Sequence, residues 1–480
     1  MQMKPLNAVM LQNFYPYPDR LQQREGYSEH VTDFTDTPYR LWNYSTGAGV
    51  DKLFATTDAG VYDVTTAGAM PSPAIALTNG KTSAVNISTG AAFYFISVNG
   101  TDDLVKYDGS TWSSVATFGA QATDELSYVE VYRQRLFFAI KNTLSLSYLP
   151  INSISGTATT YPLGAIFRQG GSIIALGTWT LDGGNGPEDQ LAVVSSKGEI
   201  AVFAGSDPGN AASWGLRGVY FIGKPLGERP LSKYGGDLLF LSENGLYPLS
   251  SAVQSSSIDR SRSVTENIRQ YFNDNARDYV GFEGWQVFAM PDIPLLLVNI
   301  PSEPNRTQVI MHAQTGAWGT LFGWNAYSFA RVGSSVYFSV ADAVYKVGGV
   351  SDNGANITST FIQSHTDFGY PLAKQVTDIK PFFITEGNFT YTMGVTNDFN
   401  EIASTTSIAK TDLAASSLWG SAIWGTAVWG GTETNVQGWE TIPDTFSVFK
   451  AFYLQISGQI SSVQYLGAQL QYQPGAYPFD

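Results

Sequence analysis

The stretch LFATTDAGVYDV, Leu53–Val64, decides the fold. An apolar run is followed by a short polar turn and then by a second short run that carries a Tyr. Asp and Gly tolerate the backbone conformations that a tight hairpin turn requires. The flanking runs contain the β-branched and aromatic side chains that favour strands. The stretch is therefore predicted to form a β-hairpin.

The same phrase recurs through the first three quarters of the chain. Its seven copies start about 40 to 57 residues apart, close to the length of a β-propeller blade. We therefore expect an all-β protein in which residues 36–350 form a β-propeller of six or seven blades. The uneven spacing leaves a β-sandwich or an unclosed chain of hairpins open as the alternative. The copies begin at Leu53, Phe93, Leu136, Leu191, Leu238, Leu295 and Val336.

Composition agrees with this interpretation and excludes several classes of protein. The 480 residues are 43% hydrophobic and only 14% charged, which is typical of a globular chain too long for one ordinary core. The net charge of −14 argues against a surface that holds nucleic acid through massed Lys and Arg. Because the chain has no Cys, disulfides and thiolate metal sites are excluded. Because the chain has no apolar run of about 18 residues, we expect it to have no membrane span. We also expect it to be made in a cytoplasm.

The hairpin phrase stops near Gly348, where Gly, Ser and Asn cluster. Beyond it, alternating segments such as NFTYTMGV, residues 388–395, predict antiparallel strands with one face in water. Residues 351–480 are therefore predicted to form a small β-sandwich or jelly-roll-like C-terminal domain. One helix is expected inside the propeller region, in residues 261–275, with Ser263 as its N-cap.

The C-terminal domain contains the segment SLWGSAIWGTAVWGG, residues 417–431. Its three Trp-Gly pairs are five residues apart, which fits neither the period of a helix nor that of a strand. Trp side chains are frequent anchors of protein interfaces. We predict that Trp419, Trp424 and Trp429 dock on a neighbouring subunit or another protein, and packing onto their own domain remains the alternative.

Residues 1–35 are predicted to form an extended arm. Pro16 and Pro18 favour an extended path, and the aromatic side chains around them suit a clasp that closes the propeller or reaches the C-terminal domain. The two arginines of the arm are expected to pair with acidic neighbours. The predicted contact residues are Phe14, Tyr15, Tyr17, Arg20 and Arg24.

No catalytic, cofactor or metal residue is predicted, and we do not expect an enzyme. The three histidines are scattered without the spacing of metal ligands. The segment GVYFIGKP, residues 218–225, lacks the Ser or Thr of a phosphate-binding loop. The acidic loop of residues 181–190 leaves calcium open as a minor alternative. The turn carboxylates Asp58, Asp102 and Glu243 are candidates for glycan hydrolysis, but acidic residues are common in turns for local reasons alone.

Both ends of the chain resemble one family. The segments LQNFYPYPDRLQQREGYSEH, residues 11–30, and VDKLFATTDAGVYDVT, residues 50–65, resemble the opening of the tail hub or nozzle proteins of short-tailed bacteriophages, also called packaged-DNA stabilisation proteins. The shared pattern includes an Asn-aromatic-Pro segment and a turn with Arg24, Gly26 and Tyr27. The segments FIQSHTDFGYPLAKQVTDIKPFF, residues 361–383, and YLGAQLQYQPG, residues 465–475, are similar as well.

This resemblance implies a non-enzymatic virion component without cofactors. It would form a hexameric ring in the virion tail below the portal and adaptor, in contact with tail fibre or tail needle proteins. Such a ring would line or close the DNA-ejection channel, and its negative charge would let double-stranded DNA pass without specific binding. The alternatives are a receptor- or glycan-binding protein of the tail fibre type and, less favoured, a propeller glycan hydrolase.

Overall fold

The computed structural model describes residues 8–47, 49, 51–182, 187–253, 262–290, 293–385, 389–400, 403–410, 434–459 and 463–475. The chain divides into two compact units. The propeller unit comprises Glu29–Thr307 and Trp324–Lys346. The terminal unit comprises Met1–Ser28, Gln308–Gly323 and Val347–Asp480. Both ends of the chain and a short internal segment therefore belong to the same unit.

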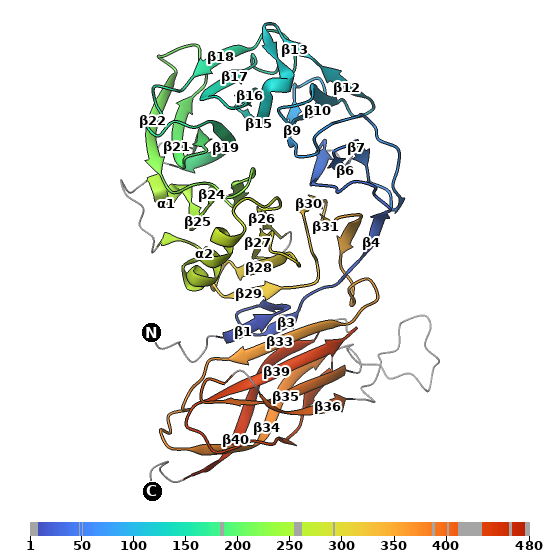
Figure 1. Cartoon of the computed structure of the whole chain (residues 1–480), viewed down its shortest axis with the longest axis vertical. Helices are drawn as coiled ribbons and strands as arrows, with labels where there is room; N and C mark the ends of the chain where they lie inside the picture. The colour runs from blue at the N-terminus through green and yellow to red at the C-terminus, as the bar shows by residue number, and fades with distance from the viewer. Residues whose placement is uncertain are drawn as a thin grey trace. The chain divides into compact units, whose positions relative to one another are not determined.

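The propeller unit is a seven-bladed β-propeller, counted over its described residues. Seven inner strands, each from a different sheet, line one central cavity, and the blades follow one another around it (Figure 1). The all-β propeller predicted from the hairpin phrase is confirmed. The seven inner strands are β5 (Arg40–Ser45), β9 (Ser83–Ser88), β15 (Leu126–Tyr132), β19 (Ile173–Asp182), β23 (Leu231–Tyr234), β26 (Gln286–Ala289) and β30 (Ser328–Val332).

Further strands follow each inner strand and pair with it in antiparallel order. The first three blades add β6 (Asp51–Thr57), β7 (Gly60–Asp63), β10 (Phe93–Val98), β11 (Leu104–Tyr107), β12 (Trp112–Val115), β16 (Arg135–Ile140), β17 (Ser145–Tyr148) and β18 (Thr159–Pro162). The later blades add β20 (Pro187–Ser195), β21 (Glu199–Gly205), β22 (Trp214–Phe221), β24 (Asp237–Ser242), β25 (Gly245–Pro248), β27 (Leu295–Ile300), β31 (Ser335–Ser339) and β32 (Val344–Val347). Small additional strands are β8 (Gly68–Ala69), β13 (Thr117–Phe118) and β14 (Gln121–Ala122).

The repeated phrase corresponds to a fixed part of the blade. Six of the seven phrases form the second and third strands of their blades, for example β6 and β7 for the phrase that starts at Leu53. The phrase that starts at Leu295 forms β27 and β28 (Thr307–His312). Apolar residues of neighbouring blades pack together, as Phe54 of the first blade does with Phe95 and Trp112 of the second. Face-to-face packing of successive sheets is the organisation that a propeller requires.

A strand from before the first blade closes the ring. β4 (Tyr27–Thr32) lies next to β32 in the sheet of the seventh blade. Phe34 continues the contact, because its N–H donates a 3.0 Å hydrogen bond to the carbonyl of Asp342. Val31 and Phe34 are buried among residues of the first and seventh blades, including Leu41 and Val344. The seventh blade is thus completed by a strand that precedes the first blade in the sequence.

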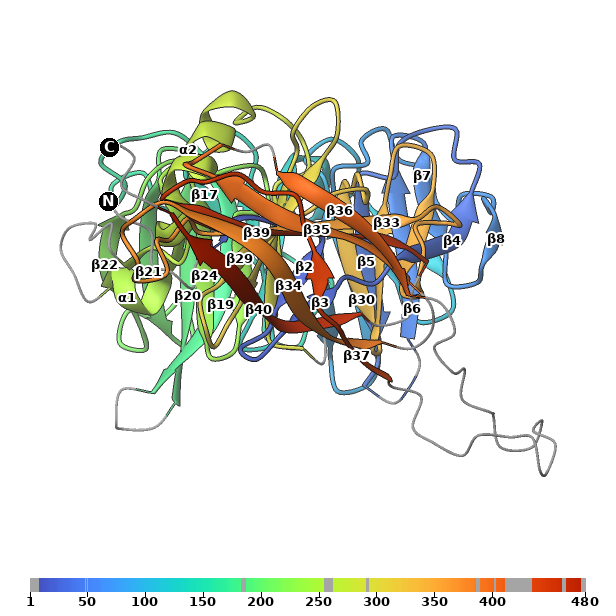
Figure 2. The same cartoon turned by 90° about the horizontal axis from the view of Figure 1, so that it is seen from below.

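The terminal unit is a sandwich of two sheets, as predicted for the C-terminal region (Figure 2). Its single core contains residues from both sheets, among them Val376 and Phe383 from one and Met393 and Leu454 from the other. One sheet is formed in this order by β28, β29 (Trp318–Leu321), β1 (Ala8–Gln12), β33 (Ile357–Gln363), β39 (Lys450–Gly458), β35 (Phe389–Asn397) and β36 (Ser404–Lys410). The other contains β2 (Phe14–Pro16), β3 (Leu21–Gln23), β40 (Gln464–Pro474), β34 (Lys374–Thr385) and β37 (Thr434–Gln437), with β38 (Glu440–Thr441) beside β34.

The predicted helix is present but begins later than expected. Helix α2 (Arg269–Asp278) follows a 3-10 turn, η3 (Glu266–Ile268), and neither has a side-chain cap. Ser263 is not the N-cap, because η3 begins at Glu266 with Thr265 in the cap position, and Ile268 has that position for α2. The Ser263 hydroxyl accepts from the N–H of Thr265 at 3.2 Å and donates to the carbonyl of Leu246, so it stabilises the turn that precedes the helix. The other short helices are η1 (Thr123–Glu125) and α1 (Leu249–Val253). Within the described ranges, every helix is too short and too polar to cross a membrane.

Candidate functional site: the central cavity of the propeller

A cavity of about 940 Å³ lies at the centre of the propeller unit. All seven inner strands contribute to its wall, so its shape depends on the whole ring. The wall is mixed in character, with apolar residues between polar ones. Its charged residues are Asp51, Glu130, Arg229, Lys233 and Arg331. Binding sites of folds built from repeated units are commonly found where all the units meet.

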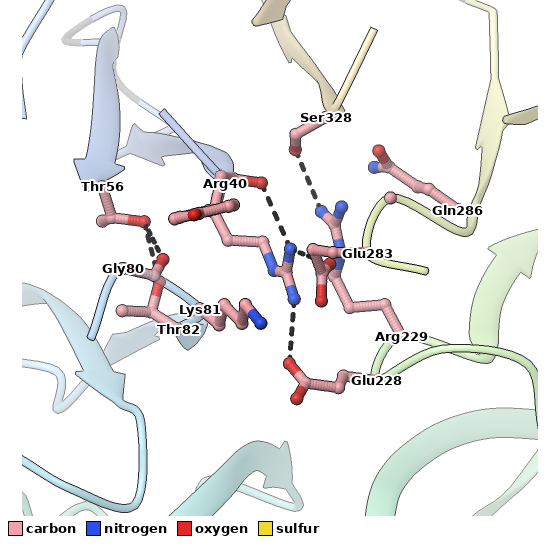
Figure 3. A network of polar contacts seen from close by, with 12 residues as sticks. Arg40, Thr56, Gly80, Lys81, Thr82, Glu228, Arg229, Glu283, Gln286 and Ser328 are labelled. Carbon is pink, nitrogen blue, oxygen red and sulfur yellow. Dashed lines mark hydrogen bonds and ion pairs between the residues drawn. The ribbon is translucent and has the colours of Figure 1, made fainter. Parts of the chain in front are cut away.

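An ion-pair network around the buried side chain of Arg40 joins four blades (Figure 3), and it extends to the cavity through Arg229. Arg40, at the start of β5, has a side chain that is only 1% exposed. Its guanidinium donates to Glu228 across 3.0 Å and to Glu283. Arg229, next to Glu228 in sequence, donates through Nη1 to the hydroxyl of Ser328 across 3.0 Å. The network therefore links segments that begin the first, fifth, sixth and seventh blades.

The charges within this network are incompletely paired. Burial raises the pKa of the Glu283 carboxyl, but the guanidinium of Arg40 outweighs burial and lowers the pKa below its ordinary value. Burial and the positive charge of Arg40 lower the pKa of Arg229 to about 9. The Nε and Nη2 groups of Arg229 are buried and have no hydrogen-bond partner among the described residues. Unpaired buried donors are costly, so this guanidinium is suited to hold water or a small anion.

A second charged group of the cavity is Glu130 on β15. Burial raises the pKa of its carboxyl, while the ammonium of Lys233 at 3.3 Å and the hydroxyl of Thr178 at 3.2 Å act in the opposite direction. Burial also raises the pKa of Tyr128, which lines the same wall. Each of the carboxylates Glu130, Glu228 and Glu283 contacts a cationic side chain. These three carboxylates are thus engaged in charge pairs, and Asp51 is a further carboxylate of the cavity wall.

The network was not predicted from the sequence. Arg40 and Glu130 are isolated charged residues within apolar and aromatic strands, RLWNYS and LSYVEVY. A charge in such a position is the available sequence signal for a buried pair, because unpaired charges are rarely tolerated inside a strand core. The partners of these residues lie far away in sequence and could not be identified from it.

Two of the three turn carboxylates considered for hydrolysis, those of Asp58 and Asp102, accept hydrogen bonds that stabilise turns and connections between blades. Asp102 accepts hydrogen bonds from Thr78 N at 2.8 Å, Thr78 Oγ1 at 2.6 Å, Asn79 N at 3.2 Å and Asn99 Nδ2 at 2.7 Å. Partial burial raises the pKa of Asp102, but these donors outweigh it and lower the pKa. Asp58 accepts from Gly80 N at 2.8 Å. Glu243 is in the turn between β24 and β25, where its N–H donates to the carbonyl of Lys224 across 2.9 Å.

The three histidines are in structural positions. His30 bonds through Nε2 to the carbonyl of Val64 at 2.7 Å, and His365 Nε2 is 3.0 Å from the hydroxyl of Thr396. His312 is buried against the ring of Tyr17. In the part of the chain that the structure describes, no group of three His, Asp or Glu residues is arranged to hold a metal ion.

The N-terminal arm forms a clasp within the terminal unit. Arg24 makes a bidentate salt bridge with Asp352, with distances of 2.7 Å to Oδ1 and 2.6 Å to Oδ2. Its Nη2 also donates to the carbonyl of Phe322 across 2.7 Å. Phe14 is fully buried in the core of the unit, and Tyr15 is only 2% exposed. These side chains therefore pack inside their own chain.

The other predicted contact residues differ in how they are placed. Arg20 pairs with the adjacent Asp19 at 3.0 Å and stacks on the ring of Tyr17 at 4.5 Å, near the surface of the terminal unit. Trp419, Trp424 and Trp429 lie outside the described residues, so their docking remains a prediction.

Comparison with known proteins gives similarity at low identity only. No protein-family model matches the chain, and no curated protein matches it. A solved structure of BBS1N in complex with ARL6DN is 9% identical, with a TM-score of 0.41 over 68% of this chain and 96% of the other. YCF48 bound to D1 peptide is 9% identical, with a TM-score of 0.36 over 72% and 99%. A glycoside hydrolase family 43 arabinoxylan arabinofuranohydrolase from Bacillus subtilis is 10% identical, with a TM-score of 0.26 over 98% and 97%.

Proposed function

We propose that this propeller protein is a non-enzymatic structural subunit of the tail of a short-tailed bacteriophage. In this role it is a tail hub or nozzle protein that assembles as a hexameric ring below the portal and adaptor. The ring lines or closes the channel through which the genome leaves, and its outer parts contact tail fibre or tail needle proteins.

The main observation in support of the proposal is that residues of the family-like N-terminal pattern form close contacts with one another and with the rest of the terminal unit. Asn13 and Arg24, which are distinct parts of the N-terminal pattern, meet in one cluster. Asn13 Oδ1 accepts from Arg24 Nε at 3.0 Å and from the N–H of Phe322 at 2.8 Å, while its Nδ2 donates to the carbonyl of Thr358 at 2.8 Å. Gly26 of the same pattern has no room for a side chain, since a Cβ there would lie 2.0 Å from the carbonyl oxygen of Ser351. These residues of the pattern therefore occupy structurally demanding positions, which supports the resemblance on which the proposal rests.

The cavity and the total charge support the same role. The carboxylates of the central network are engaged with cations, which favours a structural or binding function over glycan hydrolysis. A hexamer of a chain with net charge −14 would be a strongly anionic assembly. Phosphates are repelled by such a surface, so DNA can move along it without being held.

The experiment is to determine the mass and shape of the purified full-length chain, alone and mixed with the portal and adaptor proteins of its virion. Native mass spectrometry and electron microscopy are expected to show a hexameric ring, either in isolation or on the portal and adaptor complex. A free trimer that binds host cells or glycans would instead indicate a tail fibre-type protein. Turnover of polysaccharide that is lost in Glu130→Gln would identify the central cavity as a hydrolase site and overturn the proposal.

A further inference from the structure

A buried polar cluster lies at one end of the sandwich in the terminal unit. Asn397 is the last residue of β35, and Lys450 is the first residue of β39. The two residues are directly opposite each other in the antiparallel ladder. Asp444 lies in the segment that leads into β39, and the side chains of Asp444 and Lys450 are both 0% exposed. A buried lysine and a buried aspartate therefore meet a partly buried asparagine.

The contacts within this cluster connect all three side chains. Lys450 Nζ lies 2.7 Å from Asn397 Oδ1 and 2.6 Å from Asp444 Oδ2. The second carboxylate oxygen, Asp444 Oδ1, accepts from Asn397 Nδ2 at 3.0 Å. One oxygen of the carboxylate thus contacts the amine, and the other contacts the amide nitrogen. The hydroxyl of Ser447 donates to Asn397 Oδ1 across 3.0 Å and so polarises the amide carbonyl.

A second buried lysine lies close to this cluster. Lys374 is also 0% exposed, and its Nζ donates to the carbonyl of Val448 across 2.5 Å. Burial lowers the pKa of both lysines, although Asp444 and Asp398 act in the opposite direction on Lys450, and Asp367 and Asp398 do so on Lys374. The charge of Lys450 lowers the pKa of Lys374 further. Conversion of Lys450 into a neutral group would remove one positive charge from a site where burial makes charge costly.

We propose that Lys450 and Asn397 join in an intramolecular isopeptide bond, with Asp444 as the group that moves the proton. Asp444 accepts a proton from the Lys450 ammonium, and the resulting amine attacks Asn397 Cγ. The negative charge that develops on Asn397 Oδ1 is stabilised by the hydroxyl of Ser447. Asp444 then delivers the proton to Asn397 Nδ2, the bond from Cγ to Nδ2 breaks, and ammonia leaves. The second proton still on the Lys450 nitrogen passes through Asp444 to the ammonia, which leaves the neutral amide and an ammonium ion. The net reaction converts one lysine ammonium and one asparagine amide into a secondary amide and an ammonium ion, without oxidant or other reactant.

The geometry favours formation of this bond, because the fold holds the two reacting groups next to each other. The reacting groups belong to neighbouring strands of one sheet, so folding holds them in contact and supplies a high effective concentration. The chain has no Cys, so a covalent tie cannot come from a disulfide. The bond would fasten the end of β35 to the start of β39 and restrict the unfolded chain in the way that other cross-links do. This inference does not depend on the function proposed above.

The test is the intact mass of the folded, purified full-length chain, measured after denaturation. The expected mass is below the sequence mass by one ammonia, about 17 Da. A tryptic digest is expected to show no cleavage after Lys450 and a branched peptide that joins Lys450 to Asn397. Asp444→Asn removes the proton carrier and is expected to restore the sequence mass. Lys374→Met is the matched control, because it removes the other buried lysine and is expected to keep the loss of ammonia.

Two results would overturn the proposal. One is a wild-type chain at its full sequence mass with normal cleavage after Lys450, which would leave the cluster as a non-covalent ion pair. The other is a loss of ammonia that persists in Lys450→Met or maps to another peptide. The wild-type digest alone shows whether Lys450 is cleaved and which peptide has lost ammonia, so the proposal can be tested even if a variant fails to fold.

Discussion

Among single residues, two arginines of the central network, Arg40 and Arg229, differ in how well their guanidinium groups are paired. Arg40 is buried and paired with Glu283 and Glu228, and only its Nε lacks a partner among the described residues, whereas Arg229 keeps two such buried donors. Replacement of Arg40 leaves the largely buried Glu283 without its closest counter-charge, and breaking such a pair is strongly destabilising. Arg229 contributes less, because removing unsatisfied donors also removes their cost.

We therefore predict that Arg40→Met lowers the free energy of unfolding by about 3 to 5 kcal/mol, whereas Arg229→Met changes it by about 1 kcal/mol or less. Methionine keeps much of the volume of the side chain, so the pair of variants compares charge and not cavity formation. Urea unfolding of both variants beside the wild type measures the difference. An equal loss in both would show that Arg229 has a favourable partner in solution, such as a bound anion, and that its donors are not orphaned.

For strands and helices, the sequence predicts those features that depend on residues close together along the chain. Each hairpin phrase contains its own turn residues and its own apolar runs, so the second and third strands of the blades could be recognised locally. The closing position of β4 and the ion pairs of Arg40 depend on segments that are distant in sequence, and no local pattern encodes them. The cap assigned to Ser263 was wrong for a local reason, because its hydroxyl accepts from the N–H of Thr265 in a turn that precedes the first helical residue, Glu266.

The N-terminal clasp gives a prediction for one element. Gly26 lies where the arm meets the segment around Ser351, and its N–H donates to the carbonyl of Gly349 across 3.0 Å. A Cβ at Gly26 would clash with backbone atoms that cannot rotate away, so Gly26→Ala is expected to lower the free energy of unfolding by about 2 to 3 kcal/mol. Gly438→Ala in the same unit is the control, because its Cβ would meet only ordinary contacts. Thermal unfolding of the two variants compares them, and equal melting temperatures would show that the clasp is not rigid.

At the scale of the whole molecule, the chain enters and leaves the two units repeatedly. It starts in the terminal unit, forms most of the propeller unit, returns for Gln308–Gly323, adds Trp324–Lys346 to the propeller and ends in the terminal unit. The terminal unit consequently depends on pairings between residues more than 300 positions apart, such as Leu11 with Phe361. Composition along the sequence indicates a boundary near residue 350, but it cannot reveal that β1, β2 and β3 belong beyond it. Because such long-range pairs are slow to form, the terminal unit is expected to fold after the chain is complete.

The last prediction concerns the three tryptophans of the Trp-Gly repeat and the assembly of the proposed ring. If Trp419, Trp424 and Trp429 are interface anchors, each contributes about 2 kcal/mol or more to association, so loss of all three should abolish a ring while the monomer stays folded. The measurement is native mass and thermal unfolding of the triple Ala variant. Trp439, which is 50% exposed in the terminal unit, provides the control, because Trp439→Ala removes an indole without touching the repeat. A triple variant whose monomer unfolds would assign the three indoles to packing within their own chain, and one that still assembles would place the contact between subunits elsewhere.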